Sequence, residues 1–206
     1  MLCAILYQSG SFFVWTLRSF IAIELPGTIR AALADLQQEL KGCGADVRWV
    51  DPANIHLTLK FFGDIKEETA EEIIRLMQRT CHNHDPLNLE IKGVGMFPGP
   101  GSPRVLWVGI DSNDALADLH KELENKMSSL GFESEKRRFT PHLTLGRFRS
   151  LKGKECLLEK IRLREKDSLV PMHIRSLSLM KSELDPAGAR HTKIGGASLD
   201  KSARNI

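Results

Sequence analysis

Apolar side chains recur at helical spacing in three stretches of the chain. Positions three and four apart lie on one face of a helix, so each stripe predicts an amphipathic helix with one buried face. Gly42, Gly44 and Gly131 follow the first and third stripes, where glycine favours the end of a helix. Glu67 and Glu68 precede the second stripe, where acidic side chains favour the helix dipole. The stripes are Ile29, Leu33, Leu36 and Leu40; Ala70, Ile73, Ile74, Met77 and Cys81; and Leu116, Leu119, Leu123, Met127 and Leu130.

Other segments alternate apolar and polar residues, or are short apolar runs between turn residues, and these patterns predict β-strands. The Pro- and Gly-rich residues 96–104 predict a loop, and residues 185–188 predict a turn. The predicted strands cover residues 19–25, 87–94, 105–111 and 172–184, with a last strand that begins at Arg190.

The phrase His-Leu-Thr-Leu occurs twice, at residues 56–59 and 142–145. Side chains alternate between the two faces of a strand, so His56 and Thr58 share one face, as do His142 and Thr144. The leucines then point to the opposite face, toward a core. Pro141 suits the entry of the second strand. The repetition predicts two related lobes, each with one imidazole and one hydroxyl at a shared cleft.

Together these elements predict an α+β fold with two pseudo-symmetric lobes of mostly antiparallel sheet, flanking helices, and the active site in the cleft between the lobes. A chain of 206 residues fits one domain of two lobes or two small domains, and we expect a single bilobal domain at residues 18–206. Residues 1–17 are apolar, but no Lys or Arg precedes the run and polar residues interrupt it, unlike a signal peptide or a membrane span. We expect a disordered extension or translation from an upstream start; the alternatives are an extra strand or a hydrophobic contact for another protein.

A net charge of +3 and a pI of about 8.7 make the chain mildly basic. This is too little for a dedicated nucleic-acid coat, but it is compatible with an anionic substrate in a local patch. Cys81, His82 and His84 resemble metal ligands, but no second cluster completes a site, so we expect no metal and no cofactor. We also expect a monomer that does not bind membranes. The absence of CxxC spacing predicts reduced thiols and a cytoplasmic protein; the cysteines are Cys3, Cys43, Cys81 and Cys156.

Two imidazoles on opposite sides of a phosphorus centre can divide acid–base chemistry between them. His56 or His142 can accept the proton of an attacking water while the other protonates the leaving oxygen. The hydroxyls of Thr58 and Thr144 can donate hydrogen bonds to the non-bridging phosphate oxygens. Arg147 can hold a phosphate bidentately, but it reaches the cleft only if its strand bends or ends near Gly146. This set favours a metal-free mechanism.

Other candidate residues receive structural interpretations. Aromatic side chains are mostly core by default, although one or two could stack on a base, and Phe97 in its predicted loop is the first to test. For Arg104, solvation in the loop is favoured over substrate contact. The phenylalanines considered for this role are Phe61, Phe62, Phe97 and Phe148. His120 is expected at the edge of a helix stripe, His173 at a strand start and His191 in an exposed turn.

The paired motifs resemble the His-x-Thr-x signatures of the two-histidine phosphoesterase superfamily. Within it, the sequence around the motifs is similar to that of the bacterial and archaeal RNA 2′,3′-cyclic phosphodiesterases, historically called 2′-5′ RNA ligases. The resemblance covers about residues 18 to 199 and includes RSFIAIELP, WVDPANIHLTLKFFGDI, FPGPGSPRVLWVGI, RRFTPHLTLGRF and LSLMKSELDPAGARHTKI.

This resemblance implies a bilobal fold and metal-independent hydrolysis of a 2′,3′-cyclic phosphate, at RNA 3′ ends or in small cyclic nucleotides, to a 2′-phosphomonoester. It implies His56 and His142 as the acid–base pair, Thr58 and Thr144 as phosphate donors, and Arg147 as a phosphate contact. Two alternatives stay open: a non-catalytic module that binds RNA or nucleotide phosphates, and reversible 2′-5′ RNA ligation.

Overall fold

The computed structural model describes residues 16–111, 114–164, 167–185 and 188–201. Within these residues the α-helices are α1 (Gly27–Lys41), α2 (Glu67–Cys81), α3 (Asp114–Ser129) and α4 (Lys154–Leu163). The strands are β1 (Thr16–Glu24), β2 (Val47–Trp49), β3 (His56–Lys66), β4 (Leu87–Phe97), β5 (Val105–Asp111), β6 (His142–Phe148), β7 (Ser168–Ile174), β8 (Ser176–Asp185) and β9 (Gly188–Ser198), and a 3-10 turn, η1 (Pro52–Asn54), precedes β3.

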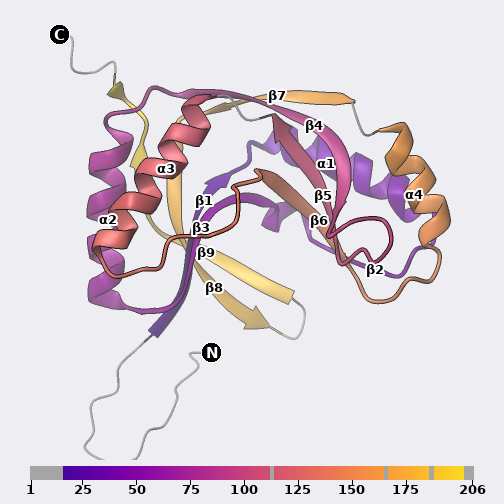
Figure 1. The fold of residues 1–206 in the computed structure, drawn as a ribbon, viewed down its shortest axis with the longest axis horizontal. Coiled ribbons are helices and arrows are strands. Elements are labelled where there is room, and N and C mark those ends of the chain that lie inside the picture. Colours follow the sequence, from indigo (N-terminus) through magenta and orange to yellow (C-terminus); the bar gives the residue numbers. More distant parts are fainter. Residues whose placement is uncertain (1–15, 112–113, 165–166, 186–187, 202–206) are drawn as a thin grey trace, which may run out of the picture.

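The described strands form one nine-stranded antiparallel sheet in the order β7-β4-β5-β6-β3-β1-β8-β9, with β2 paired to β6. The motif strands β3 and β6 are neighbours at its centre, and four strands of the main path belong to each half. The predicted lobes are therefore the two halves of a continuous sheet. In Figure 1, α2 and α3 lie beside one end of the sheet and α1 and α4 beside the other.

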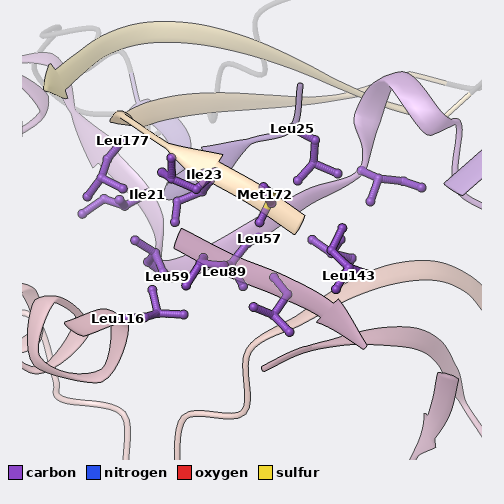
Figure 2. Packing of buried hydrophobic residues seen from close by; sticks show 14 of the residues in the cluster. Ile21, Ile23, Leu25, Leu57, Leu59, Leu89, Leu116, Leu143, Met172 and Leu177 are labelled. Atoms are coloured by element: carbon purple, nitrogen blue, oxygen red, sulfur yellow. The ribbon is translucent and has the colours of Figure 1, made fainter. Parts of the chain in front are cut away.

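The three predicted helices are confirmed, and their apolar stripes form the core with one face of the sheet. Ile29, Leu33, Leu36 and Leu40 of α1 are all buried, as are most stripe residues of α2 and α3. Figure 2 shows Leu57 and Leu59 of β3 and Leu143 of β6 in the same cluster as Leu116 of α3. The leucine faces of both motif strands thus point into the core, as expected. No helix of the described chain is long and apolar enough to cross a membrane.

Several element predictions need correction. The predicted strand 172–184 is two strands, because the chain leaves β7 at Arg175 and enters β8 in the other half of the sheet. The predicted loop 96–104 begins later, since Met96 and Phe97 belong to β4. Thr16 and Leu17 belong to β1, while the rest of the predicted extension, residues 1–15, lies outside the described residues.

The prediction of reduced cysteines is wrong for two of the four. Cys43, which follows α1, and Cys156 of α4 form a disulfide with Cα atoms 5.5 Å apart. They are 113 residues apart in the chain, so only the fold reveals their contact. Cys81 is a buried free thiol whose pKa is raised to about 12 by burial and by the nearby Asp200 and Glu122 carboxylates. Cys3 lies outside the described residues.

Candidate active site

The first motif places His56 at the start of β3, directly after the turn η1. Asp51 caps this turn by accepting a hydrogen bond from the Ala53 amide, and the turn presents the Asn54 carbonyl to the imidazole. The Nδ1 of His56 lies 2.8 Å from the Asn54 carbonyl oxygen. A carbonyl can only accept, so Nδ1 carries the proton and Nε2 remains for acid–base chemistry.

The second motif repeats this arrangement. The Nδ1 of His142 lies 2.8 Å from the carbonyl oxygen of Thr140, again two residues earlier. The intervening residue, Pro141, has no amide hydrogen, and its carbonyl accepts the Ile110 amide hydrogen of β5. Each motif therefore fixes its imidazole by the same local hydrogen bond and leaves the same ring nitrogen free.

The two motif strands meet at a single registered pair, Leu57 opposite Leu143. One residue along each strand the side chains point to the other face of the sheet. His56 and Thr58 on β3, and His142 and Thr144 on β6, therefore share the face opposite the core. The structure brings together these four predicted residues on adjacent antiparallel strands.

A β-bulge follows the motif in both strands. On β3, Thr58 pairs with Ala22 and Phe61 pairs with Phe20. Ala22 and Phe20 are two residues apart on β1 and so lie on one face, which puts Phe61 on the face of Thr58 although the two are three residues apart. The bulge explains why Leu59 and Lys60 are both buried while Phe61 is 51% exposed.

The matching bulge on β6 brings Arg147 to the site face. Thr144 pairs with Trp107 and Arg147 pairs with Val105, which are two residues apart on β5. The sequence predicted that Arg147 would reach the site only if its strand bends or ends near Gly146, and the bulge provides this irregularity. Gly146 beside it lets β2 pack closely on β6, because a Cβ there would lie 2.5 Å from the Val47 Cγ1 of β2. Arg147 and Phe61 occupy equivalent positions in the two motifs.

Buried Lys60 ties the two motif strands to a common support. Its Nζ lies 2.9 Å from Glu124 Oε2 on α3 and 2.7 Å from the carbonyl oxygen of Glu133. Glu124 Oε2 also accepts the amide hydrogen of Glu135 at 3.0 Å. A buried ion pair of this kind requires several good hydrogen bonds, and here it anchors the segment that leads into β6.

Aromatic rings enclose His56. Phe20 of β1 stacks on it with ring centroids 4.7 Å apart, and His191 of β9 meets it edge-on at 5.1 Å. Burial lowers the pKa of His56 to about 4, with nearby His191 lowering it further and the Asn54 hydrogen bond opposing the shift. The prediction that His191 lies in an exposed turn is wrong, because the β8–β9 pairing carries it onto the site face in a half-buried position.

Different rings surround His142. Phe97, at the end of β4, meets it edge-on at 5.0 Å, and Trp107 of β5 lies 6.5 Å away. Gly95 and Gly109 leave room for the indole, since a Cβ at Gly95 would lie 2.3 Å from the Trp107 ring. Phe97 therefore packs beside an imidazole at a strand end. Sequence patterns missed Trp107, whose only signal was its alternation with buried Leu106 and Val108.

The remaining histidines have structural partners. The His120 ring stacks on Phe139 with centroids 3.8 Å apart, and burial lowers its pKa. His173 lies within β7, beyond its start, and its Nδ1 is 2.7 Å from Asn88 Oδ1. Arg104 is exposed, and its interpretation as a solvated loop residue stays a prediction.

The Cys81–His84 segment forms pairs instead of a ligand cluster. His82 Nδ1 lies 2.7 Å from Asp200, and His84 Nε2 lies 3.0 Å from Glu122. Over the described ranges, no group of three or more His, Cys, Asp or Glu side chains is arranged to hold a metal ion.

Comparisons with known proteins identify a family and several relatives. The sequence profile described as the 2′-5′ RNA ligase superfamily matches residues 25–186. A Methanothermobacter thermautotrophicus protein named RNA 2′,3′-cyclic phosphodiesterase is 35% identical over 175 residues, which cover 85% of this chain and 95% of that protein. A protein of the same name from Methanocaldococcus jannaschii is 33% identical over 172 residues, covering 84% of this chain and 95% of that protein.

Solved structures share the fold. A crystal structure of a Thermus thermophilus protein superposes with a TM-score of 0.75 at 26% identity, covering 89% of this chain and 98% of that chain. E. coli LigT, solved in complex with 3′-AMP, gives a TM-score of 0.72 at 22% identity, covering 89% of this chain and 98% of LigT.

Proposed function

This chain belongs to the 2′-5′ RNA ligase superfamily, and on that basis we propose that it hydrolyses 2′,3′-cyclic phosphates to 2′-phosphomonoesters, with the 3′ ends of RNA as substrate. The curated relatives carry the name RNA 2′,3′-cyclic phosphodiesterase, and they match this chain over most of their own length. Small 2′,3′-cyclic nucleotides present the same reacting group and belong to the same proposal.

One observation supports this reaction above all. Two imidazoles lie on one face of two adjacent strands, and each gives its Nδ1 hydrogen to a carbonyl oxygen 2.8 Å away. Both rings therefore have Nε2 as the reactive atom. Neither imidazole can flip about its Cβ–Cγ bond without losing its Nδ1 hydrogen bond. A reaction that needs one proton removed and one delivered is suited to such a pair.

The proposed step breaks one P–O bond and forms another. A water oxygen attacks the phosphorus, and one Nε2 accepts the proton that the water loses. The P–O3′ bond breaks, and the other imidazole gives its Nε2 proton to O3′, which leaves a 2′-phosphate and a free 3′-hydroxyl. The two rings exchange protonation states in each turnover, and solvent restores them.

Three further side chains are proposed to hold the phosphate. The hydroxyls of Thr58 and Thr144 lie on the site face, one strand repeat from each imidazole, where they can donate to the non-bridging oxygens. Charge grows on these oxygens in the transition state, so such donors stabilise it selectively. Arg147, brought to this face by the β6 bulge, supplies a guanidinium that can bind two oxygens at once.

Phe61 is proposed to stack on a base of the RNA. It is one of only three large apolar side chains that are exposed in the described chain, and it shares the face of Thr58. Arg18 lies over its ring, with the guanidinium carbon 4.9 Å from the centroid. An exposed ring beside a cation is the usual platform for single-stranded nucleic acid. Phe61 replaces Phe97 as the preferred stacking residue, because Phe97 packs against Trp107 and His142.

A binding module without turnover is the second candidate. It would hold phosphates on the same face, but a binder is better served by Arg or Lys than by imidazoles with fixed tautomers. Ligation of RNA ends through a 2′-5′ linkage is the reverse chemistry, with a 5′-hydroxyl in place of water. We propose a monomer, and a cytoplasmic protein because RNA is the substrate; the Cys43–Cys156 disulfide removes the support that free thiols would have given.

Product analysis tests the proposal. The purified protein is incubated in EDTA with an RNA oligonucleotide that ends in a 2′,3′-cyclic phosphate, and 2′- and 3′-phosphate products are resolved. We expect only the 2′-phosphate. A 3′-phosphate would reverse the assignment of the leaving oxygen. Retained RNA binding without any product would favour the binding module, and joined oligonucleotides in excess of hydrolysis would favour ligation.

A further inference from the structure

His191 is the third imidazole on the site face, and it comes from the last strand of the sheet. It pairs with Ser182 of β8, two residues from Met180, which pairs with Phe20 of β1. Residues two apart on a strand share a face, so His191 lies on the same side of the sheet as Phe20 and His56. This placement follows from register and does not depend on the rotamer of the side chain.

Three rings form a compact group around His56. Phe20 and His56 are nearly parallel, with an interplanar angle of 25° and centroids 4.7 Å apart. His191 stands at 85° to both rings, with centroids 5.1 Å from each. The His56 imidazole is thus covered on a face by Phe20 and contacted at an edge by His191, and this limits its rotation in two directions.

Strand β9 also holds the hydrogen-bond acceptor of His56. The Nδ2 of Asn54 donates to the Ala189 carbonyl oxygen at 3.0 Å, two residues before His191. The carbonyl of the same Asn54 accepts the Nδ1 hydrogen of His56 at 2.8 Å. One short segment of β9 therefore supports both the ring and the group that sets its tautomer.

His191 acts on His56 through its ring and not through a hydrogen bond from Nδ1. His191 Nδ1 is buried, and it has no hydrogen-bond partner among the described residues. An unsatisfied buried polar atom is unfavourable, and a phenyl ring would fill the same space without that penalty. Among the described ring contacts of His142 there is no imidazole, and Phe97 takes the edge-on place with centroids 5.0 Å apart. The imidazole at 191 thus distinguishes the two motif histidines.

We propose that His191 is a positioning residue for the reaction: it fixes the His56 ring against Phe20 so that Nε2 stays directed at the substrate phosphate. This inference rests on the proposed function for its kinetic consequence, but the effect on His56 exists without substrate. Burial lowers the pKa of His191, as it lowers that of His56 to about 4.

Charged groups on the neighbouring strands must be considered in any titration. Glu24 of β1 pairs with His56 across the strands and raises its pKa slightly. Its Oε1 accepts the Ser178 hydroxyl of β8 at 2.5 Å and lies 3.5 Å from Lys193 Nζ of β9. Glu24 is therefore held by β8 and β9 through Oε1, and it faces His56 whether or not His191 is present.

The test compares His191→Ala and His191→Phe, with His173→Ala as the matched control from the other end strand. The kcat and KM are measured on cyclic-phosphate-ended RNA, and the His56 ring is titrated by NMR in the absence of substrate. For His191→Ala we expect kcat to fall about 10- to 100-fold with KM within about twofold, because displaced reacting groups lose rate more than affinity. The pKa of His56 should rise as burial is lost.

The other variants complete the test. His191→Phe should recover most of kcat, since the ring is restored, and His173→Ala should match the wild type. A kcat for His191→Ala within twofold of wild type, an unchanged His56 pKa, or a loss confined to KM would overturn the proposal, the last by making His191 a substrate contact. If the wild type shows no turnover, the proposed function fails, while the His56 titration still decides the positioning role.

Discussion

Leu57 and Leu143 lie opposite each other in the only registered pair between β3 and β6 in the described structure. Both side chains are fully within the core, so the residues beside them must face the other way. This pair therefore relates the two motifs by a local two-fold arrangement and places His56 and His142 on one surface. In each four-residue motif, the two leucines point into the core, and the histidine and threonine point to the opposite face of the sheet.

The pairing of β2 with β6, which holds Arg147 opposite Arg48, should depend on Gly146. A Cβ at this position would lie 2.5 Å from Val47 Cγ1 and 3.2 Å from the Arg48 carbonyl oxygen. We expect Gly146→Ala to destabilise the protein by about 1–3 kcal/mol, as overpacking does, and to raise KM by displacing Arg147. Urea unfolding measures the first effect. Gly101→Ala, where nothing lies within 4 Å of the added Cβ, is the control; equal stability of both variants would contradict the account.

Stability should fall as pH drops through the range in which His56 would ionise. The pKa of His56 is about 4 in the folded protein against an ordinary value of 6.5. Between pH 4 and 6.5, His56 is therefore protonated in the unfolded chain and neutral in the folded protein. The contribution of His56 to the free energy of unfolding is then fully present above pH 6.5. It is lost as pH falls to 4, by on the order of 3 kcal/mol. His120 and His191 shift in the same direction.

Chemical denaturation at several pH values measures this loss. His56→Gln should show a shallower fall between pH 6.5 and 4 than the wild type. Parallel curves for the wild type and His56→Gln would show that His56 is not held neutral by the fold.

The Cys43–Cys156 bridge should contribute to stability by restricting the unfolded chain. It closes a loop of 113 residues, for which disulfides typically contribute about 2–5 kcal/mol. We expect Cys43→Ser and Cys156→Ser to lower Tm equally and the double variant to fall no further. Thermal melts with and without reductant check this, because reductant should affect only the wild type. Additive single effects would mean that the two thiols are not bonded in solution.

Phe61 should govern affinity for RNA but not the chemical step. Loss of a stacking ring typically costs about 1–3 kcal/mol per base, so Phe61→Ala should raise KM about 5- to 150-fold with little change in kcat. Phe61→Tyr keeps the platform and should resemble the wild type. Leu163→Ala removes a comparably exposed apolar side chain far from the motifs and serves as the control. A KM that is unchanged in Phe61→Ala would show that no RNA base stacks on Phe61.

Residues with strong local periodicity were predictable from the sequence. The stripes of α1, α2 and α3 are buried as expected, because a helix that covers a sheet needs one continuous apolar face. The motif faces were predictable for the same reason at period two. Helix α4 escaped prediction since it is ten residues long and buries only Leu157 and Ile161.

The boundary between β7 and β8 did leave a signal in the sequence. Buried Met172 and Ile174 occupy even positions, while buried Leu177 and Leu179 occupy odd ones. The change of phase at Arg175 marks the point where the chain leaves one half of the sheet for the other. By contrast, His191 reached the site through the register of β8 with β9 and of β8 with β1, which no single segment encodes.

The central claim is that His56 and His142 perform two complementary proton transfers, and kcat/KM of the alanine variants on cyclic-phosphate-ended RNA tests it most directly. We predict that His56→Ala and His142→Ala each lose about 10²- to 10⁴-fold, while both still bind the RNA and unfold cooperatively. The double variant should lose little more than the worse single one, because the two groups act as a unit. A folded single variant that keeps activity within tenfold of the wild type would contradict the claim.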